Sequence, residues 1–238
     1  MKALRFLLII VCTLSLTGCA STKQADSDSS LGKAQQTLDS LYQHYSAKDS
    51  YLLRESYPFD EQHKVTYLAS EDQANMPNQF SYLWPYSGTF SAVNALLEAT
   101  HDKKYQQLLD KRVLPGLEEY FDIQRTPNAY SSYIQTAPTS DRFYDDNVWL
   151  GIDFTDIYQI TQEKRYLDKA QLIWKFIESG TDSLLGGGIY WCEQKKESKN
   201  TCSNAPGSVL ALKLFKATND SIYFRQGKEL YEWTQKNL

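Results

Sequence analysis

Residues 161–166, which read TQEKRY, decide the fold because the same pattern occurs twice more, as THDKKY at residues 100–105 and TNDSIY at residues 218–223. Each copy follows the pattern Thr-x-acid-x-x-Tyr and precedes an amphipathic run. In the copy that begins at residue 161, apolar residues recur at i, i+3 or i+4 and i+7, which is typical of a helix with one buried face. The acidic residue stands where it can cap a helix or favour its positive N-terminal end. The repeat therefore predicts outer helices that pack along one side.

More thoroughly apolar segments lie between these amphipathic ones, at residues 90–97, 148–160 and 208–215. A helix that is apolar nearly all round is an inner, buried helix. Inner and outer helices alternate about every 60 residues, a period that indicates an α-solenoid or a closed α/α toroid. The one strand signal is a possible turn and hairpin at residues 186–191, which read GGGIYW. The predicted fold class is all-α.

Three long polar segments, at residues 56–85, 125–144 and 180–203, each lead into an inner helix. In a toroid these segments gather at one end, and long loops in a compact domain are usually functional. We therefore expect a cleft where the inner helices begin.

The N-terminus resembles a lipoprotein signal. A short basic segment, MKALR, precedes an apolar run at residues 6–16, which is too short to span a bilayer but fits a signal peptide. Cys19 directly follows two small residues and is the expected lipid attachment site. The predicted organisation is a signal peptide at 1–18, lipidated Cys19 with a flexible tether at 19–30, and one domain at 31–238. An ordinary secretory signal with an incidental cysteine, or an uncleaved anchor, is the alternative.

This organisation predicts an exported protein that lipid holds on a bacterial membrane, at the outer membrane or cell surface. Loss of the leader removes two of the 25 basic residues, so the net charge falls from −4 to about −6. A mildly acidic domain without a basic block argues against nucleic acid as a partner. The 17 Tyr, 10 Phe and 5 Trp residues suit a surface for neutral sugars, although such rings also build cores. No feature specifies an oligomeric state.

Cys192 and Cys202 flank a polar loop. Because disulfides persist in exported proteins, we expect a bridge between them, and two free buried thiols are the alternative.

Several catalytic constellations are missing from the sequence. The three histidines, at positions 44, 63 and 101, form no His-x-x-x-His pair, so a zinc hydrolase is not expected and we predict no metal. Neither a Walker loop, nor G-x-G-x-x-G, nor G-x-S-x-G occurs, and we predict no cofactor. Hydrolytic chemistry by elimination falls to carboxylates.

Asp145 and Asp146 stand at the start of an inner helix. A glycosidase needs one ionised and one protonated carboxyl group close together. The helix N-terminus stabilises one of them as the anion, and that charge favours protonation of its neighbour. The alternative is that one of these aspartates only caps the helix.

Three motifs in order resemble glycoside hydrolase family 76, the endo-α-1,6-mannanases. They are YDDNVWLG at residues 144–151, GGGIYW at 186–191 and KNTCSN at 199–204, and the likeness runs from about residue 35 to the end. The resemblance implies an (α/α)6 barrel, or six-hairpin toroid, and retaining cleavage within α-mannan. It also implies Asp145 as nucleophile and Asp146 as general acid/base. The substrate-binding residues that it implies are Tyr144, Asn147, Trp149, Gly187, Gly188, Trp191, Lys199, Asn200 and Asn204.

Two departures from the family pattern bear on the site. Leu150 stands where the family often has a second Trp, which removes a potential aromatic contact. A closed ring at about 60 residues per pair needs about 350 residues, so we expect an incomplete toroid of three to four helix pairs.

We also expect Trp84, at the first inner helix, to pack in the core, as large aromatics usually do.

Other functions remain open at this stage. The chain could be a non-catalytic mannan-binding surface lipoprotein or an inactive truncated product. It could also be another α/α-toroid sugar enzyme, such as an unsaturated-uronyl hydrolase or a sugar epimerase.

Overall fold

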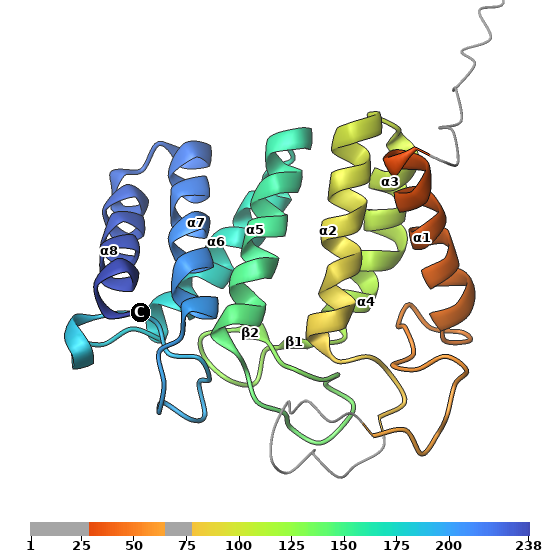
Figure 1. The fold of residues 1–238 in the computed structure, drawn as a ribbon, viewed down its shortest axis with the longest axis horizontal. Helices are drawn as coiled ribbons and strands as arrows, with labels where there is room; N and C mark the ends of the chain where they lie inside the picture. Colours follow the sequence, from red (N-terminus) through yellow and green to blue (C-terminus); the bar gives the residue numbers. More distant parts are fainter. Residues whose placement is uncertain (1–28, 65–77) are drawn as a thin grey trace, which may run out of the picture.

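The structure is a computed structural model that describes residues 29–64 and 78–238. Helices dominate, and inner helices alternate with outer helices along the chain (Figure 1), which confirms the all-α prediction. The inner row consists of α2 (Leu83–Thr100), α5 (Tyr144–Thr161) and α7 (Thr201–Thr218). The outer row consists of α1 (Ser30–Tyr45), a composite of α3 (Lys103–Leu108), η2 (Leu109–Val113) and α4 (Leu114–Glu118), then α6 (Lys164–Ser179) and α8 (Ser221–Asn237).

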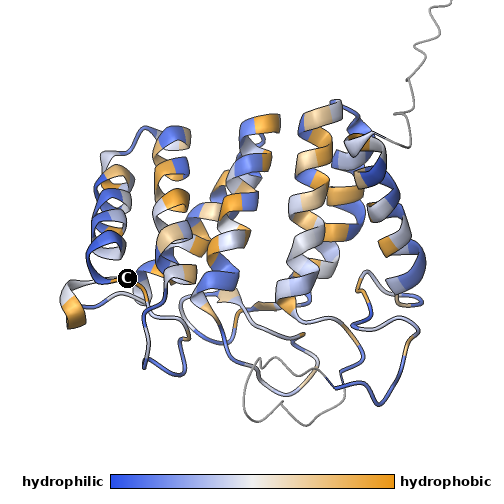
Figure 2. Cartoon of the chain, viewed as in Figure 1, coloured by the Kyte–Doolittle hydropathy of each residue, from blue (hydrophilic) through white to orange (hydrophobic). Residues whose placement is uncertain are grey.

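The inner helices are more thoroughly buried than the outer ones. Figure 2 shows apolar residues along α2, α5 and α7, whereas α1 is mostly hydrophilic. In α5, Tyr144, Val148, Phe154 and Ile157 are all buried, and α5 packs against α2, α6 and α7. Phe90 of α2 meets Phe154 of α5 edge to face, with ring centroids 4.9 Å apart. The inner row is therefore the centre of the hydrophobic core.

The Thr-x-acid-x-x-Tyr repeat is the corner between an inner and an outer helix. The Thr161 hydroxyl donates to the Ile157 carbonyl oxygen over 2.8 Å and accepts from the Glu163 N–H over 3.3 Å. Gln162 between them adopts a left-handed conformation with φ of 61°, which ends α5. The other two corners repeat this geometry, and there Asp102 and Asp220 cap the following helix through their carboxylates. The short motif thus turns the chain back on itself.

The tyrosine of each repeat reaches back to the preceding outer helix. Gln35 of α1 donates to the Tyr105 hydroxyl over 2.9 Å. Likewise, Tyr166 donates to Asp110 of η2 over 2.7 Å, and Gln171 of α6 donates to Tyr223 over 3.3 Å. These contacts join consecutive outer helices, so the repeat sets both the corner and the order of the row.

The helices α5 and α7 approach closely at Gly151. A Cβ atom built on Gly151 would lie 2.5 Å from Cδ2 of Leu210, which is fully buried. A side chain at residue 151 would therefore force the buried Leu210 side chain to move.

The described parts of the long segments meet at one end of the helices, as the sequence predicts (Figure 1). A short antiparallel pair, β1 (Phe121–Asp122) with β2 (Ala129–Tyr130), lies between α4 and α5 and was not predicted. The hairpin expected at residues 186–191 is wrong as a ladder. A single isolated bridge between Thr181 and Ile189 encloses a 3-10 turn, η3 (Leu184–Gly186), which three successive glycines with positive φ end.

The predicted signal peptide, Cys19 and nearly all of the tether lie outside the described residues. The first described helix begins at Ser30, capped by Ser29. Within the described part of the chain, no helix combines the length and apolar character needed to cross a bilayer.

Candidate functional site

Asp145 and Asp146 occupy the first turn of α5, at the end of the molecule where the long segments meet. The N-cap residue is Phe143, which makes no side-chain cap, so neither aspartate occupies the N-cap position of this helix. The two carboxyl groups differ in their surroundings.

Asp145 is half-buried and faces polar groups from other elements. The Trp191 indole Nε1 donates to Asp145 Oδ2 over 3.1 Å. The thiol of Cys202, in the first turn of α7, also faces the carboxylate. Burial raises the pKa of Asp145, while the thiol, the indole and the backbone N–H of Asp146 act to lower it. These donors favour the ionised form.

Asp146 is buried, and no hydrogen bond from the described residues reaches its carboxyl group. Desolvation raises the pKa of Asp146 well above its ordinary value, and the charge of Asp145 raises it further. The pair therefore favours one proton, held on Asp146, with Asp145 ionised. This division matches the electrostatic argument from the sequence.

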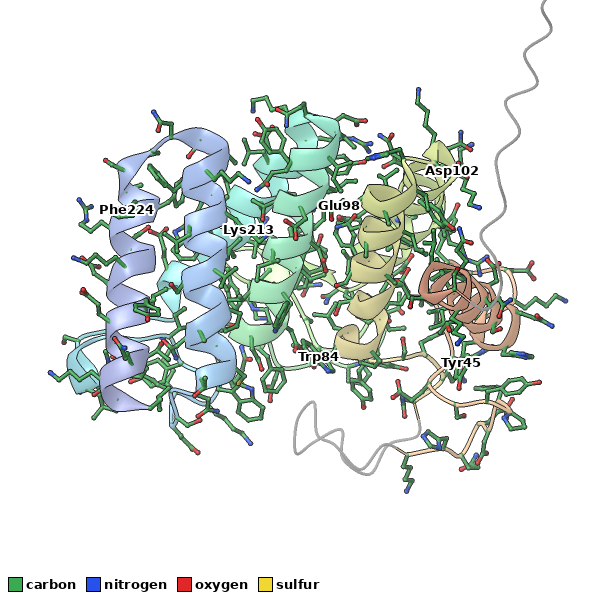
Figure 3. All side chains as sticks on the ribbon, turned by 45° about the horizontal axis from the view of Figure 1, so that its top comes forward. Tyr45, Trp84, Glu98, Asp102, Lys213 and Phe224 are labelled. Carbon is green, nitrogen blue, oxygen red and sulfur yellow. The ribbon has the colours of Figure 1, made fainter. Side chains whose placement is uncertain are left out.

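Two exposed tryptophans stand beside this pair. Trp149 lies one turn after the aspartates on α5, and Trp84 begins α2 at the same end of the molecule (Figure 3). The ring centroids are 6.5 Å apart in an edge-on arrangement, and the side chains are 41% and 51% exposed. The expectation that Trp84 packs in the core is wrong, because Trp84 lies on the exposed face of α2, whereas Leu83 and Tyr86 beside it are buried. Leu150 is fully buried, so its position faces the core.

Three residues expected to bind substrate are instead buried parts of the framework. The Asn147 amide bonds to both backbone groups of Tyr130, over 2.9 Å each, and thereby attaches β2 to α5. The Asn204 amide bonds likewise to both backbone groups of Ile189. Tyr144 stacks on Phe176 with ring centroids 4.6 Å apart. The expected role of these three side chains is corrected, because each is fully buried.

Lys199 also differs from its expected role in the cleft. Its buried ammonium donates to Asp182 Oδ1 over 2.6 Å, to the Gly187 carbonyl over 2.7 Å and to the Leu184 carbonyl over 2.9 Å. An ammonium has three N–H donors, and all three are used within the protein. Lys199 therefore fixes the glycine-rich turn, and Asn200 beside it is the N-cap residue of α7.

The glycine-rich turn owes its glycines to backbone conformation and packing. Gly187 and Gly188 have φ values of 121° and 85°, which side chains rarely adopt. A Cβ on Gly188 would lie 2.7 Å from the Trp233 ring. The turn thus closes tightly over α8, whose Trp233 indole donates to the Leu185 carbonyl.

The predicted disulfide is absent, since Cys192 and Cys202 are free thiols. The Cys192 sulfur is buried and points to Gln194 Oε1, 3.9 Å away, whereas Cys202 is exposed and faces Asp145. The two thiols are directed to different partners, so the expectation of a bridge, which rested on the exported compartment, is wrong. The contact between Cys202 and Asp145 gave no signal in the sequence.

Arg142 is a further residue that sequence reasoning missed. Its fully buried guanidinium pairs with Glu193 through both Nε and Nη2, and Nη1 donates to the Pro127 carbonyl over 2.9 Å. It lies 3.6 Å from Asp122 Oδ2 as well. Arg142 therefore joins the two loops that flank the start of α5.

Within residues 29–64 and 78–238, no three His, Cys, Asp or Glu side chains are grouped so that they could hold a metal ion.

The sequence profile of glycosyl hydrolase family 76 matches residues 56–238. The chain belongs to this family. A family 76 mannosidase from Bacteroides thetaiotaomicron is 29% identical, with a TM-score of 0.70 over 85% of this chain and 52% of its own. A family 76 hydrolase from a bovine strain of that species is also 29% identical, with a TM-score of 0.71 over 89% and 43%. No curated protein matches the chain.

A third solved structure is an inactive variant of an α-1,6-mannanase from Salegentibacter, with two consecutive aspartates changed to asparagine, in complex with α-1,6-mannotriose. It is 23% identical, with a TM-score of 0.64 over 87% of this chain and 52% of its own, and at this identity it supports the fold alone. Family 76 structures are (α/α)6 toroids, which confirms the predicted fold type. The chain spans about half the length of these structures.

Proposed function

We propose that this chain carries the catalytic part of a glycoside hydrolase that cleaves α-1,6-mannosidic linkages within α-mannan. The single observation that supports it most is the pair Asp145 and Asp146, adjacent on a buried helix, where burial raises the pKa of both and the charge of Asp145 raises that of Asp146 further. The Salegentibacter variant with two consecutive aspartates replaced is inactive and holds α-1,6-mannotriose, which agrees with a function for such a pair. The family and its mannanase members support the same substrate class.

The proposed reaction retains anomeric configuration and has two steps. The Asp145 carboxylate attacks the anomeric carbon and forms an ester with it, while Asp146 gives its proton to the departing glycosidic oxygen. The Asp146 carboxylate then takes a proton from water, whose oxygen attacks the same carbon and releases Asp145 as the free anion. Both carboxyl groups return to their starting states, so no cofactor is consumed.

Trp84, Trp149 and Trp191 are the proposed sugar contacts. Each is at least 38% exposed and each lies at the end of the molecule that carries the aspartates. The C–H faces of pyranose rings pack well on indole surfaces, which bring large apolar area together with a polar edge. The exposed aromatic group favours a neutral sugar over the acidic substrate of an unsaturated-uronyl hydrolase.

The test is hydrolysis of debranched α-1,6-mannan by the full chain, with Asp145→Asn and Asp146→Asn beside it. Asp168→Asn, at an exposed carboxylate of α6, is the matched control. We expect internal cleavage by the wild type and the control, and loss of at least a thousandfold for both site variants. Asp146→Asn should recover partly on a substrate with a good leaving group, since that substrate needs no proton. Binding of mannan without any cleavage would overturn the proposal in favour of a binding protein.

We also propose that the chain is exported and carries lipid on Cys19. The support is the sequence alone: a basic start, an apolar run of 11 residues and a cysteine after two small residues. Metabolic labelling with a palmitate analogue tests it. Label that disappears in Cys19→Ser supports the anchor, and equal labelling of both chains would overturn it.

A further inference from the structure

Trp191 is fixed by contacts on both its backbone and its ring. Its carbonyl oxygen accepts from the N–H of Tyr144, the first residue of α5, over 2.9 Å. Its own N–H donates to the Ser198 carbonyl over 2.9 Å. The ring packs against Phe143 with centroids 4.8 Å apart. The orientation of the indole is therefore set before any ligand arrives.

The polar edge of this indole is directed at Asp145. Its one N–H donor is used on Asp145 Oδ2, over 3.1 Å, so the indole has no second N–H for a sugar hydroxyl. A wall for stacking a sugar needs only the ring face, and a phenylalanine would provide that. The N–H thus serves a purpose that the expected stacking role leaves out.

Cys202 approaches the same carboxylate from a different element. It lies in the first turn of α7, whereas Trp191 lies in the loop between α6 and α7. Asp145 thereby faces an indole N–H from the loop and a thiol from the neighbouring inner helix, in addition to the backbone N–H of Asp146 on α5.

We propose that Trp191 is a positioning residue, whose N–H, together with the Cys202 thiol, fixes the direction of the Asp145 carboxylate and keeps it ionised next to protonated Asp146. This inference rests on the proposed hydrolase function and deepens it. Hydrogen bonds to a charged group are stronger than those between neutral groups, so two such donors select the anion. The thiol remains protonated as a donor, because burial and Asp145 raise the pKa of Cys202 to about 11.

The test compares Trp191→Phe, which removes the N–H but keeps a ring, with Cys202→Ala and Cys202→Ser. Trp174→Phe is the matched control, because it removes an indole donor that bonds to Gln226 on α8. The first measurement is a carbon NMR titration of the full chain labelled at aspartate carboxyl carbons, with the Asp145 signal assigned through Asp145→Asn. The second measurement is the pH dependence of mannan hydrolysis.

We expect the Asp145 titration midpoint to move to higher pH in Trp191→Phe and in Cys202→Ala. Cys202→Ser, which keeps a donor, and Trp174→Phe should titrate as the wild type does. In hydrolysis the acidic limb should move to higher pH in the same two variants. For Trp191→Phe, kcat should fall about tenfold with little change in KM, as expected for one lost hydrogen bond to a charge.

A wild-type chain that does not hydrolyse mannan would count against the proposed function, while the NMR titration would still decide the role of Trp191. An unchanged Asp145 midpoint in Trp191→Phe, with a native far-UV spectrum, would overturn the inference. So would a variant with raised KM alone, which is the result expected of a stacking wall. If Trp191→Phe fails to fold, Cys202→Ala against Cys202→Ser decides the question in the same way.

Discussion

The Ser91 hydroxyl donates to Asp153 Oδ2 over 2.8 Å, and this contact joins α2 to α5 below the candidate site. The Asn94 amide adds a second link, to the Asp153 carbonyl over 2.9 Å. Burial raises the pKa of Asp153 from 3.8 to about 7, although the Ser91 hydrogen bond acts in the opposite direction. Asp153 is thus a buried acid that the folded chain prefers to keep neutral.

The raised pKa of Asp153 predicts how stability depends on pH. Between about pH 4 and pH 7 the unfolded chain releases a proton that the folded chain keeps, so the free energy of unfolding falls as pH rises through this window. The loss from this one group is at most about 4 kcal/mol. Asp153→Asn should remove that loss and be more stable than the wild type at pH 8. Urea unfolding of the wild type and of Asp153→Asn at pH 4.5 and pH 8 measures this difference in stability, with Asp168→Asn as control. A variant that is weaker by the same amount at both values would contradict the prediction.

Replacement by alanine should have opposite effects on the free energy of unfolding at Gly188 and at Gly88. Gly188→Ala places a Cβ against the Trp233 ring at a φ of 85°, so we expect a cost of about 2–4 kcal/mol in the free energy of unfolding. Gly88→Ala, in α2 with nothing near its Cβ, should instead stabilise by about 0.5–1 kcal/mol. Thermal unfolding of the two variants checks both signs. Equal effects would show that the turn at Gly188 adapts.

Loss of the buried cation Arg142 should lower the free energy of unfolding far more than loss of an exposed cation. Arg142→Met leaves Glu193 and Asp122 without this partner, and we expect it to cost about 3–5 kcal/mol. Arg165→Met, which removes an exposed cation beside Asp110 and Glu163, should cost less than about 1 kcal/mol. Denaturant midpoints at one pH give the comparison. Similar costs for both would mean that the Arg142 pairs contribute little.

The two free thiols should react differently with iodoacetamide when no reductant is present. Cys202 is exposed but its pKa is raised to about 11, so at pH 8 we expect slow alkylation. Asp145→Asn removes the charge that contributes to that pKa and should speed the reaction severalfold. Cys192 is buried and should react only after unfolding. Peptide mass spectrometry resolves each site, and failure of both to react in unfolded, unreduced protein would reveal a disulfide.

The spacing of apolar residues predicted the inner helices α2, α5 and α7 and the outer helices that follow the repeats, because this spacing depends only on residues within the same helix. The corners at residues 100–105, 161–166 and 218–223 are equally local, since their hydrogen bonds run within a few residues. The β1–β2 pair was missed because two residues per strand leave no pattern to find.

The sequence predicted only those site residues whose positions are set by the helix that carries them. Asp145 and Asp146 stand at a helix start that the sequence shows. Lys199 was misread because its partners, Asp182 and two turn carbonyls, depend on the path of a loop. Arg142 looks like a loop charge in sequence, yet Glu193 and Pro127 surround it in space. Trp84 was misread because a large aromatic residue was assigned to the core by its type, whereas it lies on the exposed face of α2.

The position of the candidate site residues on α5 and α7 depends on Gly151, which lies away from the site itself. Asp145 is carried by α5 and Cys202 by α7, and the contact of Gly151 with Leu210 sets how near those helices come. A methyl group at residue 151 would force the Leu210 side chain to move where the two helices touch. The proposed arrangement of Asp145 and Cys202 at one end of the molecule thus depends on packing near the middle of α5, at a residue that takes no part in the proposed reaction.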